Sequence, residues 1–427
     1  MRIGRRREAT QPKLQECESC GLLQMVPALE PGMTARCVRC PTTLRRTNTH
    51  TLDYSIALTI AALILLSIMS MTTLMGVDKA GIRHSANLFS GPVELVRQGM
   101  TPLAIVVVFV TVAAPFGKLI GTLYVLFGLQ SRRPPRHMRR VFVIAEKLRP
   151  WSMIEVFVFG VFVAYVKLGD LVHLELDAGV YALLALMIVL IWADASLDRE
   201  RIWERLDPGD LGARGMPPPG SPEEDLIGCE VCGLVSNRDA ADPYCPRCGS
   251  ALHARRPNSI ARTWALLIAA IILYIPANYY PVLTVMQLGA GQPSTILGGV
   301  QELVKSQMYP LAALVFFASI AVPMLKMIGL AGMVIMVQLK RTPWLRDQTR
   351  LYHGVRFIGR WSMIDIFMES LLGALVKFGN VVTIQPGVGA LAFCAVVILT
   401  MFAAETFDPR LMWDAGARRA DIQPAPA

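Results

Sequence analysis

Eight of the nine cysteines stand in four C-x-x-C pairs, and these pairs form two quartets far apart in the chain. The quartets are Cys17-x2-Cys20-x16-Cys37-x2-Cys40 and Cys229-x2-Cys232-x12-Cys245-x2-Cys248. Four thiolates on two short turns can complete a tetrahedral shell around zinc. Gly21, Gly233 and Gly249 follow second cysteines, where such turns need backbone angles that glycine adopts easily. We therefore predict two structural zinc ions per chain, one in each quartet.

Two other kinds of chemistry fit the same cysteine spacing. Iron takes the same four-sulfur geometry in rubredoxin-like sites, and C-x-x-C pairs also serve thiol–disulfide chemistry. A closed shell of four sulfurs leaves no open coordination position, which favours a site that folds a small domain. The ninth cysteine, Cys394, lies within an apolar stretch and is interpreted as a small packing residue.

Ionisable residues also stand inside apolar stretches, where a charge is costly and needs a reason. Two short stretches carry an acid near the start and a lysine near the end, Glu155 with Lys167 and Asp365 with Lys377. On a helix the two charges of each stretch lie about 18 Å apart, so they cannot pair with each other. Each lysine is expected at the outer interface, either extending toward water or contacting lipid phosphate or a partner at the outer face.

The depths of the charges predict other partners. Lys118 and Lys326 each stand sixteen residues after the start of a longer apolar stretch, about 24 Å along a helix. That depth places Lys118 near Glu155 and Lys326 near Asp365, and Glu369 adds an acid one turn further along the same face. Two interpretations stay open: contacts that hold helices together, or protonatable pairs that exchange partners during function.

The elements that carry these charges are membrane spans. The chain has 427 residues, 53% of them hydrophobic, and a mean hydropathy of +0.45. A bilayer core needs about 20 apolar residues in a helix. Eight such stretches are present: 55–76, 102–128, 151–168, 179–197, 263–286, 310–338, 361–378 and 387–404.

Lysine and arginine predict the orientation of these spans. With both termini inside, the inner segments contain 34 of the 42 Lys and Arg residues, and the outer loops contain four. The distribution places the cysteine quartets and both termini in the cytoplasm, where disulfides do not persist. It also argues against nucleic-acid binding, because the net charge of +10 is spread over segments beside an anionic leaflet.

The second half of the sequence repeats the first at an offset of about 210. RPWSMIEVFVFGVFVAYVKLGD at 149–170 matches GRWSMIDIFMESLLGALVKFGN at 359–380, and LDRERIW at 197–203 matches FDPRLMW at 407–413. Each half has an even number of spans, so the halves have parallel topology. The predicted fold is an all-α polytopic membrane protein with two homologous four-helix modules. Its parts are a zinc ribbon at 1–50, a module at 51–205, a linker at 206–224, a second ribbon at 225–258, a second module at 259–410 and a tail at 411–427.

These features together resemble the paraquat-inducible protein A family (PqiA and its relative LetA). The resemblance rests on the two cysteine quartets, the P-W-S-M-I-E and R-W-S-M-I-D openings, the two V-K-x-G turns and F-D-P-R at 407–410. It implies a bacterial inner-membrane protein that works with a periplasmic MCE-domain protein in moving phospholipid between membranes. The second module has Pro276, Asn278 and Pro281 late in its first span, a family-like element that the first module lacks.

Three functions follow as hypotheses. The first is a lipid-transport component, which is not an enzyme; the sequence contains no Walker A motif, so ATP is not expected to be its own energy source. The second is a membrane oxidoreductase that uses metal-bound cysteines, although all six histidines lie in predicted loops and none is placed to bind haem. The third is an anchor that recruits the tunnel protein without transporting lipid.

Overall fold

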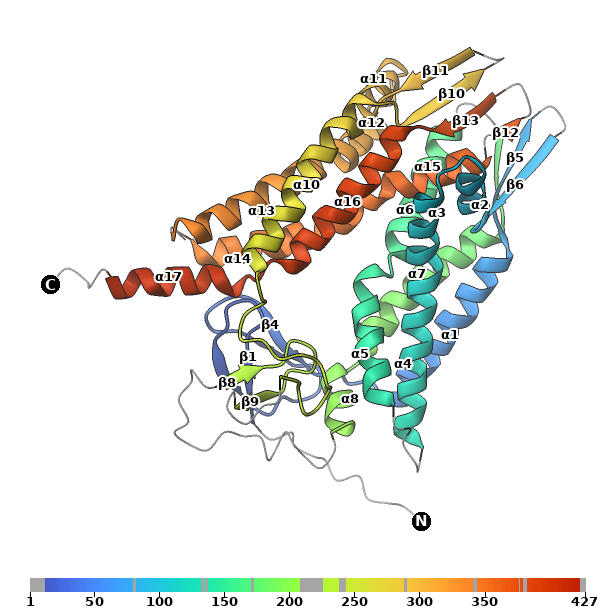
Figure 1. Ribbon diagram of the computed structural model, residues 1–427. Coiled ribbons are helices and arrows are strands. Elements are labelled where there is room, and N and C mark those ends of the chain that lie inside the picture. Colours follow the sequence, from blue (N-terminus) through green and yellow to red (C-terminus); the bar gives the residue numbers. More distant parts are fainter. Residues whose placement is uncertain are drawn as a thin grey trace.

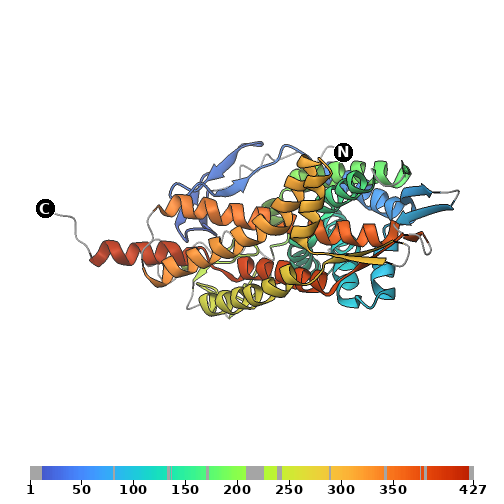
Figure 2. The same cartoon turned by 90° about the horizontal axis from the view of Figure 1, so that it is seen from above.

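The computed structural model of the chain describes residues 12–79, 82–131, 135, 137–169, 173–207, 226–237, 243–287, 290–340, 344–375, 377–378 and 382–422 (Figure 1). Two groups of helices, one from each half of the sequence, stand side by side. The cysteine ribbons lie together at one end of the molecule and β-sheets at the opposite end. Seen from above, the sheets again lie far from the C-terminal helix (Figure 2). We call the two ends the ribbon end and the sheet end.

The first module is built from helices that run between these two ends. They are α1 (Leu52–Met71), α2 (Ser90–Arg97), α3 (Thr101–Val108), the π turn η1 (Phe109–Ala113), α4 (Ala114–Gln130), α5 (Met138–Leu148), the 3-10 turn η2 (Arg149–Trp151), α6 (Ile154–Gly169), α7 (Ala178–Ser196) and α8 (Arg199–Arg205). Helix α1 begins where the Thr51 hydroxyl accepts the N–H of Tyr54 at 3.4 Å, satisfying a donor that the first turn leaves free.

The second module repeats this order. Its elements are α10 (Ser259–Tyr279), α11 (Ile296–Lys305), α12 (Tyr309–Phe316), the π turn η4 (Phe317–Ala321), α13 (Val322–Gln338), α14 (Leu345–Ile358), the 3-10 turn η5 (Gly359–Met363), α15 (Ile364–Leu375), α16 (Val388–Thr406) and α17 (Arg410–Ile422). The repeat in the sequence is therefore a repeat in the structure, helix by helix.

Seven helical segments are long and apolar enough to cross a membrane in the described part of the chain. The predicted span 361–378 is the exception, because η5 and the 12-residue α15 replace a continuous helix there. The first predicted span, 55–76, ends at Met71, where strand structure begins. The sequence pattern located the apolar stretches but did not show where a helix gives way to another element.

A π turn precedes the proline in the second apolar segment of each module. Pro115 and Pro323 have no N–H, and their rings crowd the preceding turn, so a wider turn accommodates them. Within these turns, Thr111 and Ser319 each donate a hydrogen bond of 2.7 Å to the carbonyl oxygen four residues earlier. The same device at equivalent positions is a further sign of the duplication.

The all-α prediction is wrong at the sheet end. Strands β5 (Thr73–Lys79), β6 (Ile82–Asn87) and β7 (His173–Leu176) form an antiparallel sheet in the order β6-β5-β7. Strands β10 (Leu283–Gln287), β11 (Ala290–Ser294), β12 (Lys377–Phe378) and β13 (Val382–Pro386) form another in the order β11-β10-β13-β12. In each sheet, strands from the connection between the first two spans of a module pair with strands from the connection before its last span. This pairing provides hydrogen-bond partners for backbone groups that loops would leave unsatisfied.

The ribbons are small pairs of hairpins. The first contains β1 (Lys13–Glu16), β2 (Leu23–Val26), β3 (Thr34–Arg36) and β4 (Thr43–Arg46), paired as β1-β2 and β3-β4. The second contains β8 (Leu226–Gly228), β9 (Val235–Asn237) and an isolated bridge between Tyr244 and Ala251. The predicted linker, 206–224, lies almost wholly outside the described residues.

Candidate functional site

The cysteine quartets are closed clusters of buried sulfur atoms. In each quartet the four Sγ atoms lie within 4.8 Å of one another, and all eight cysteines are buried. Sulfur pairs are 3.4 and 3.6 Å apart in the first quartet and 3.5 and 3.6 Å in the second. A tetrahedral shell with zinc–sulfur bonds of about 2.3 Å has edges of about 3.8 Å. The donor sets therefore fit a four-coordinate metal ion.

The turns beneath the sulfurs have the expected backbone. Gly21, Gly233 and Gly249 have φ of 71°, 70° and 73°, in the left-handed region that favours glycine. Their N–H groups donate to the carbonyl oxygens of the first cysteine of each pair at 2.8 to 2.9 Å. The prediction from the sequence is confirmed for these three turns.

Each cysteine cluster is buried against the module of the other repeat. The first quartet forms a cluster with Trp413 of α17, with Leu345 of α14 packed beside it. The second quartet belongs to a cluster that contains Phe142 of α5 and Trp203 of α8. Trp203 and Trp413 are equivalent residues in the repeat. The ribbons therefore cross over, so that each repeat supports the cysteine cluster of the other.

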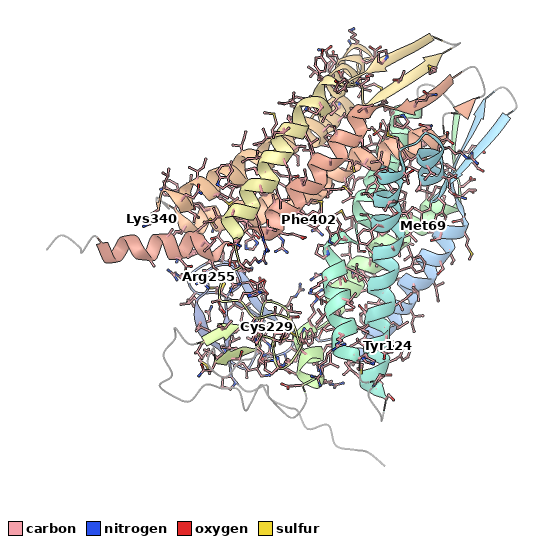
Figure 3. The ribbon with its side chains drawn as sticks, in the orientation of Figure 1. Met69, Tyr124, Cys229, Arg255, Lys340 and Phe402 are labelled. Atoms are coloured by element: carbon pink, nitrogen blue, oxygen red, sulfur yellow. The ribbon has the colours of Figure 1, made fainter. Side chains whose placement is uncertain are left out.

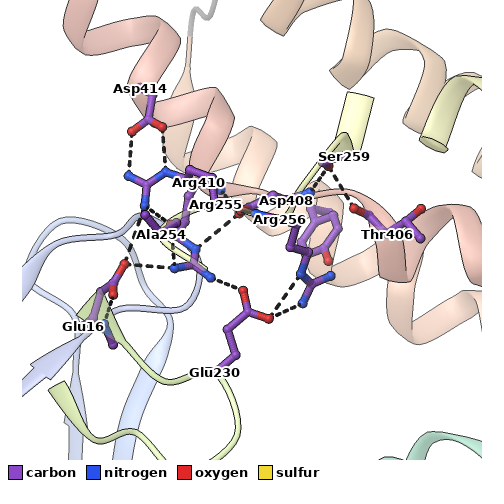
Figure 4. A network of polar contacts seen from close by, with 12 residues as sticks. Glu16, Glu230, Ala254, Arg255, Arg256, Ser259, Thr406, Asp408, Arg410 and Asp414 are labelled. Carbon is purple, nitrogen blue, oxygen red and sulfur yellow. Dashed lines mark hydrogen bonds and ion pairs between the residues drawn. The ribbon is translucent and has the colours of Figure 1, made fainter. Parts of the chain in front are cut away.

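Arg410 joins both ribbons to the second module (Figure 4). Its side chain is only 3% exposed and bonds to Asp408 at 3.3 Å, to Glu16 of the first ribbon at 3.0 Å and to Glu230 of the second. Glu16 also accepts the N–H of Gly228 at 2.7 Å. The sequence marked F-D-P-R as part of a repeat, but nothing in the pattern showed that its arginine would connect the two ribbons.

The repeated stretch that carries the span charges forms the contact between the modules. Helix α6 packs against α15, and the rings of Phe157 and Phe367 meet edge to face at 5.5 Å and 85°. These two residues are 210 positions apart, so they are equivalent, and each contacts its own counterpart. Gly160 allows the close approach, since a Cβ there would lie 2.8 Å from the Cβ of Phe367. A local two-fold relation between the modules follows.

The predicted pairing of Lys118 with Glu155 is wrong. Lys118 on α4 bonds instead to Asp194 on α7 at 2.7 Å. Glu155 is half-buried on α6 and makes no hydrogen bond or ion pair with another described residue. The prediction used only the depth of each residue along its helix. Which neighbour a side chain meets also depends on the direction in which it points around the helix axis. Asp194 could have been found as the one acid within its predicted span.

The predicted pairing of Lys326 with Asp365 is also wrong. Lys326 is 2% exposed and donates to the Thr400 hydroxyl at 2.8 Å and to the carbonyl oxygen of Gly359 at 3.4 Å. The second module has Ala404 where the first has Asp194, so the acid that pairs with Lys118 has no counterpart here. The two lysines are equivalent in sequence but differ in their surroundings.

Asp365 and Glu369 lie within electrostatic range of a cation from the other module. The carboxyl group of Asp365 contacts the Ser319 hydroxyl, and Lys167 of the first module lies within electrostatic range of both acids. One carboxyl oxygen of each acid is buried without a hydrogen-bond partner in the described part of the chain. The sequence placed Lys167 at the outer interface and did not predict this electrostatic interaction across the modules. The side chain of Lys377 lies outside the described residues.

The proline element of the second module ends α10. The Asn278 amide donates to the carbonyl oxygen of Tyr274 at 2.9 Å, and the N–H of Tyr280 donates to the carbonyl oxygen of Pro276 at 3.0 Å. A Cβ atom on Gly389 would come within 2.8 Å of the carbonyl oxygen of Pro281. The element therefore packs against the start of α16.

The fold and these sites define a multi-pass membrane protein made of two equivalent modules, with two four-cysteine ribbons at one end. The sequence profile described as Paraquat-inducible protein A matches residues 52–207 and 260–416, which are the two modules. The chain belongs to this family, as the sequence analysis expected.

Curated relatives match nearly the whole chain. Intermembrane transport protein PqiA of Escherichia coli (strain K12) is 35% identical over 93% of this chain and 95% of its own length. Lipophilic envelope-spanning tunnel protein A of the same strain is 32% identical over 94% of this chain and 91% of its own length. A probable intermembrane transport protein of Haemophilus influenzae is 27% identical over 94% and 96%. No solved structure matches the chain.

Proposed function

We propose that this chain is the inner-membrane component of an intermembrane lipid transport system. In this proposal it passes phospholipid to or from a periplasmic tunnel protein with MCE domains. The observation that carries the proposal is the match to proteins named for intermembrane transport and for an envelope-spanning tunnel, over at least nine-tenths of each chain. These names describe transport proteins, which agrees with the expectation that the chain is not an enzyme.

The proposed orientation places the ribbon end in the cytoplasm. The distribution of Lys and Arg supports it, because the segments at the ribbon end hold most of them. The sheets formed around β5 and β10 then face the periplasm, where the tunnel protein would meet them. The ribbons would each hold one structural zinc ion through their four cysteines, which supplies folding energy to a small domain.

The cluster of Lys167, Asp365 and Glu369 is the proposed coupling point between the modules. It joins a cation of one module to two acids of the other, so a change in its charge would alter the contact between α6 and α15. Lys118 with Asp194 and Lys326 with Thr400 each lie within one module, where a structural role accounts for them. Full lipid transport by the Asp365→Asn variant would refute the coupling role.

A reconstituted transfer assay tests the function. The full chain is placed in liposomes that contain fluorescent phospholipid, and the tunnel protein from the same organism is added as the acceptor. Transfer that requires the chain supports the proposal. Binding of the tunnel protein without transfer favours the anchor hypothesis, and neither binding nor transfer refutes both. Metal analysis of the purified chain is expected to give two zinc ions per chain; iron with visible absorbance would favour the redox alternative.

A further inference from the structure

A cavity lies between the two modules at the ribbon end. It has a volume of about 520 Å³, within the usual range of ligand pockets. Three parts of the chain line it: α5 with η2 from the first module, the second ribbon, and α10, α14 and α16 from the second module. Figure 3 shows polar side chains around this space, between the ribbon that carries Cys229 and the helix that carries Phe402.

Cationic side chains from both modules line this cavity. Lys147 comes from α5, Arg262 from α10 and Arg356 from α14. None of the three side chains forms an ion pair or a hydrogen bond with another residue in the described ranges. Arg256 also lines the cavity, and it bonds to Glu230 at 3.1 Å. We call this space the cationic pocket.

The carboxylates of the cationic pocket leave this charge incompletely balanced. Glu146 bonds to Arg199 at 2.9 Å, and Glu230 is shared between Arg256 and the buried Arg410. Among the acids that line the cavity, only Glu405 has no direct ion pair, and it lies within electrostatic range of Arg356 and Arg256. Glu18 of the first ribbon, outside the lining, is within electrostatic range of the same two arginines. These two acids face four cationic side chains that line the cavity.

Further arginines gather beside the cationic pocket. Arg149, the first residue of η2, lies within electrostatic range of Arg199 and of Arg360 from the other module, and also of the acids Asp194 and Glu146. Like charges brought together in a concave, partly desolvated space repel one another and raise the local positive potential. An anion in the cationic pocket would relieve this repulsion and bridge the modules.

We propose that the cationic pocket binds a phosphate group. Guanidinium groups recognise phosphate oxygens through paired, charge-assisted hydrogen bonds, and a lysine adds a compact charge. Two sources provide this chemistry: free phosphate from the aqueous side, or the headgroup of an anionic phospholipid in the adjacent leaflet. This proposal does not depend on the proposed transport function, because it is argued only from the cationic side chains that line the cavity.

Binding to the purified full chain tests this site. In neutral detergent, equilibrium dialysis measures binding of radiolabelled inorganic phosphate, and native mass spectrometry measures binding of phosphatidylglycerol against phosphatidylcholine. The triple variant Lys147→Gln, Arg262→Gln and Arg356→Gln is expected to weaken binding at least about a hundredfold, since each lost charge-assisted contact accounts for about tenfold. A charge-preserving variant, Arg262→Lys with Arg356→Lys, is expected to bind more tightly than the triple variant but less tightly than the native chain, because lysine keeps the charge and loses the paired hydrogen bonds.

The matched control is Arg140→Gln with Arg350→Gln. These exposed arginines lie on α5 and α14 but do not line the cationic pocket, so binding is expected to be unchanged. If phosphatidylglycerol displaces phosphate, the cationic pocket binds a lipid headgroup. If phosphate binds and phosphatidylglycerol does not, the cationic pocket binds a soluble anion. Absence of both, or equal binding by the triple variant, overturns the proposal.

Discussion

Replacing Arg410 with glutamine is expected to release the ribbons from the second module. The side chain is 3% exposed, and its partners Asp408 and Glu16 are 1% and 10% exposed. Removing one partner of a buried ion pair costs about 3–5 kcal/mol, because the other charge stays buried. Glu16 keeps Arg255 at 3.7 Å and Glu230 keeps Arg256 at 3.1 Å, so the lower value, about 3 kcal/mol, applies.

Hydrogen exchange at the ribbons measures this effect. A loss of about 3 kcal/mol raises the population of undocked ribbons about 150-fold. The amide of Arg256, at the end of the second ribbon, donates to Asp408 of the second module at 3.0 Å and reports on docking directly. Its protection in the full chain should fall by this factor, while α1 and α16 stay protected. The exposed pair of Arg350 with Asp347 is the control, and its loss should cost less than about 0.5 kcal/mol. Unchanged exchange at Arg256 in the Arg410→Gln variant would refute the reasoning.

Three further predictions concern the first module and its contact with the second. Lys118→Met should destabilise the chain by about 1–2 kcal/mol in thermal unfolding. Adding Asp194→Leu should restore much of this stability, because the ion pair is then removed as a whole and leaves no partner charge behind. A further loss of stability in the double variant would contradict this. Burial raises the pKa of Glu200 to about 7, so its contribution to stability is fully present below pH 4.5 and is lost as the pH rises through about 7. Between pH 4.5 and about 7, the thermal unfolding midpoint of the Glu200→Gln variant should therefore fall less than that of the native chain. An equal fall in both proteins would contradict a raised pKa of Glu200. Gly160→Leu should separate α6 from α15 and reduce cross-linking between them, whereas Gly373→Leu, with open space at its Cβ, should not.

The cysteine sites were predictable because their chemistry is local. Two C-x-x-C pairs within a short segment bring four sulfurs together through turns that the sequence itself encodes. The duplication was equally visible, since matching residues recur at a constant offset. Apolar length located the spans, because the bilayer sets a required number of residues.

The partners of the buried charges were not predictable in the same way. Lys118 and Lys326 occupy equivalent positions, yet one bonds to Asp194 and the other to Thr400. Sequence gives the depth of a residue along a helix, but tertiary packing decides which neighbour its face meets. The sequence also did not predict the sheets at the sheet end, because β5 pairs with β7 across about a hundred residues and short segments carry little periodic signal.

The crossing of the ribbons has a consequence for how such a chain arises. Trp203 packs on the ribbon that follows it, and Trp413 packs on the ribbon at the opposite end of the sequence. Phe157 and Phe367, which are equivalent residues, meet at the centre. This is the contact pattern of a closed, two-fold symmetric dimer in which each subunit covers the cysteine ribbon of its partner. A half-length chain of one ribbon and one module would find every one of these contacts in a second copy of itself. Two such copies joined in one chain are free to differ from each other, as Asp194 and its counterpart Ala404 do.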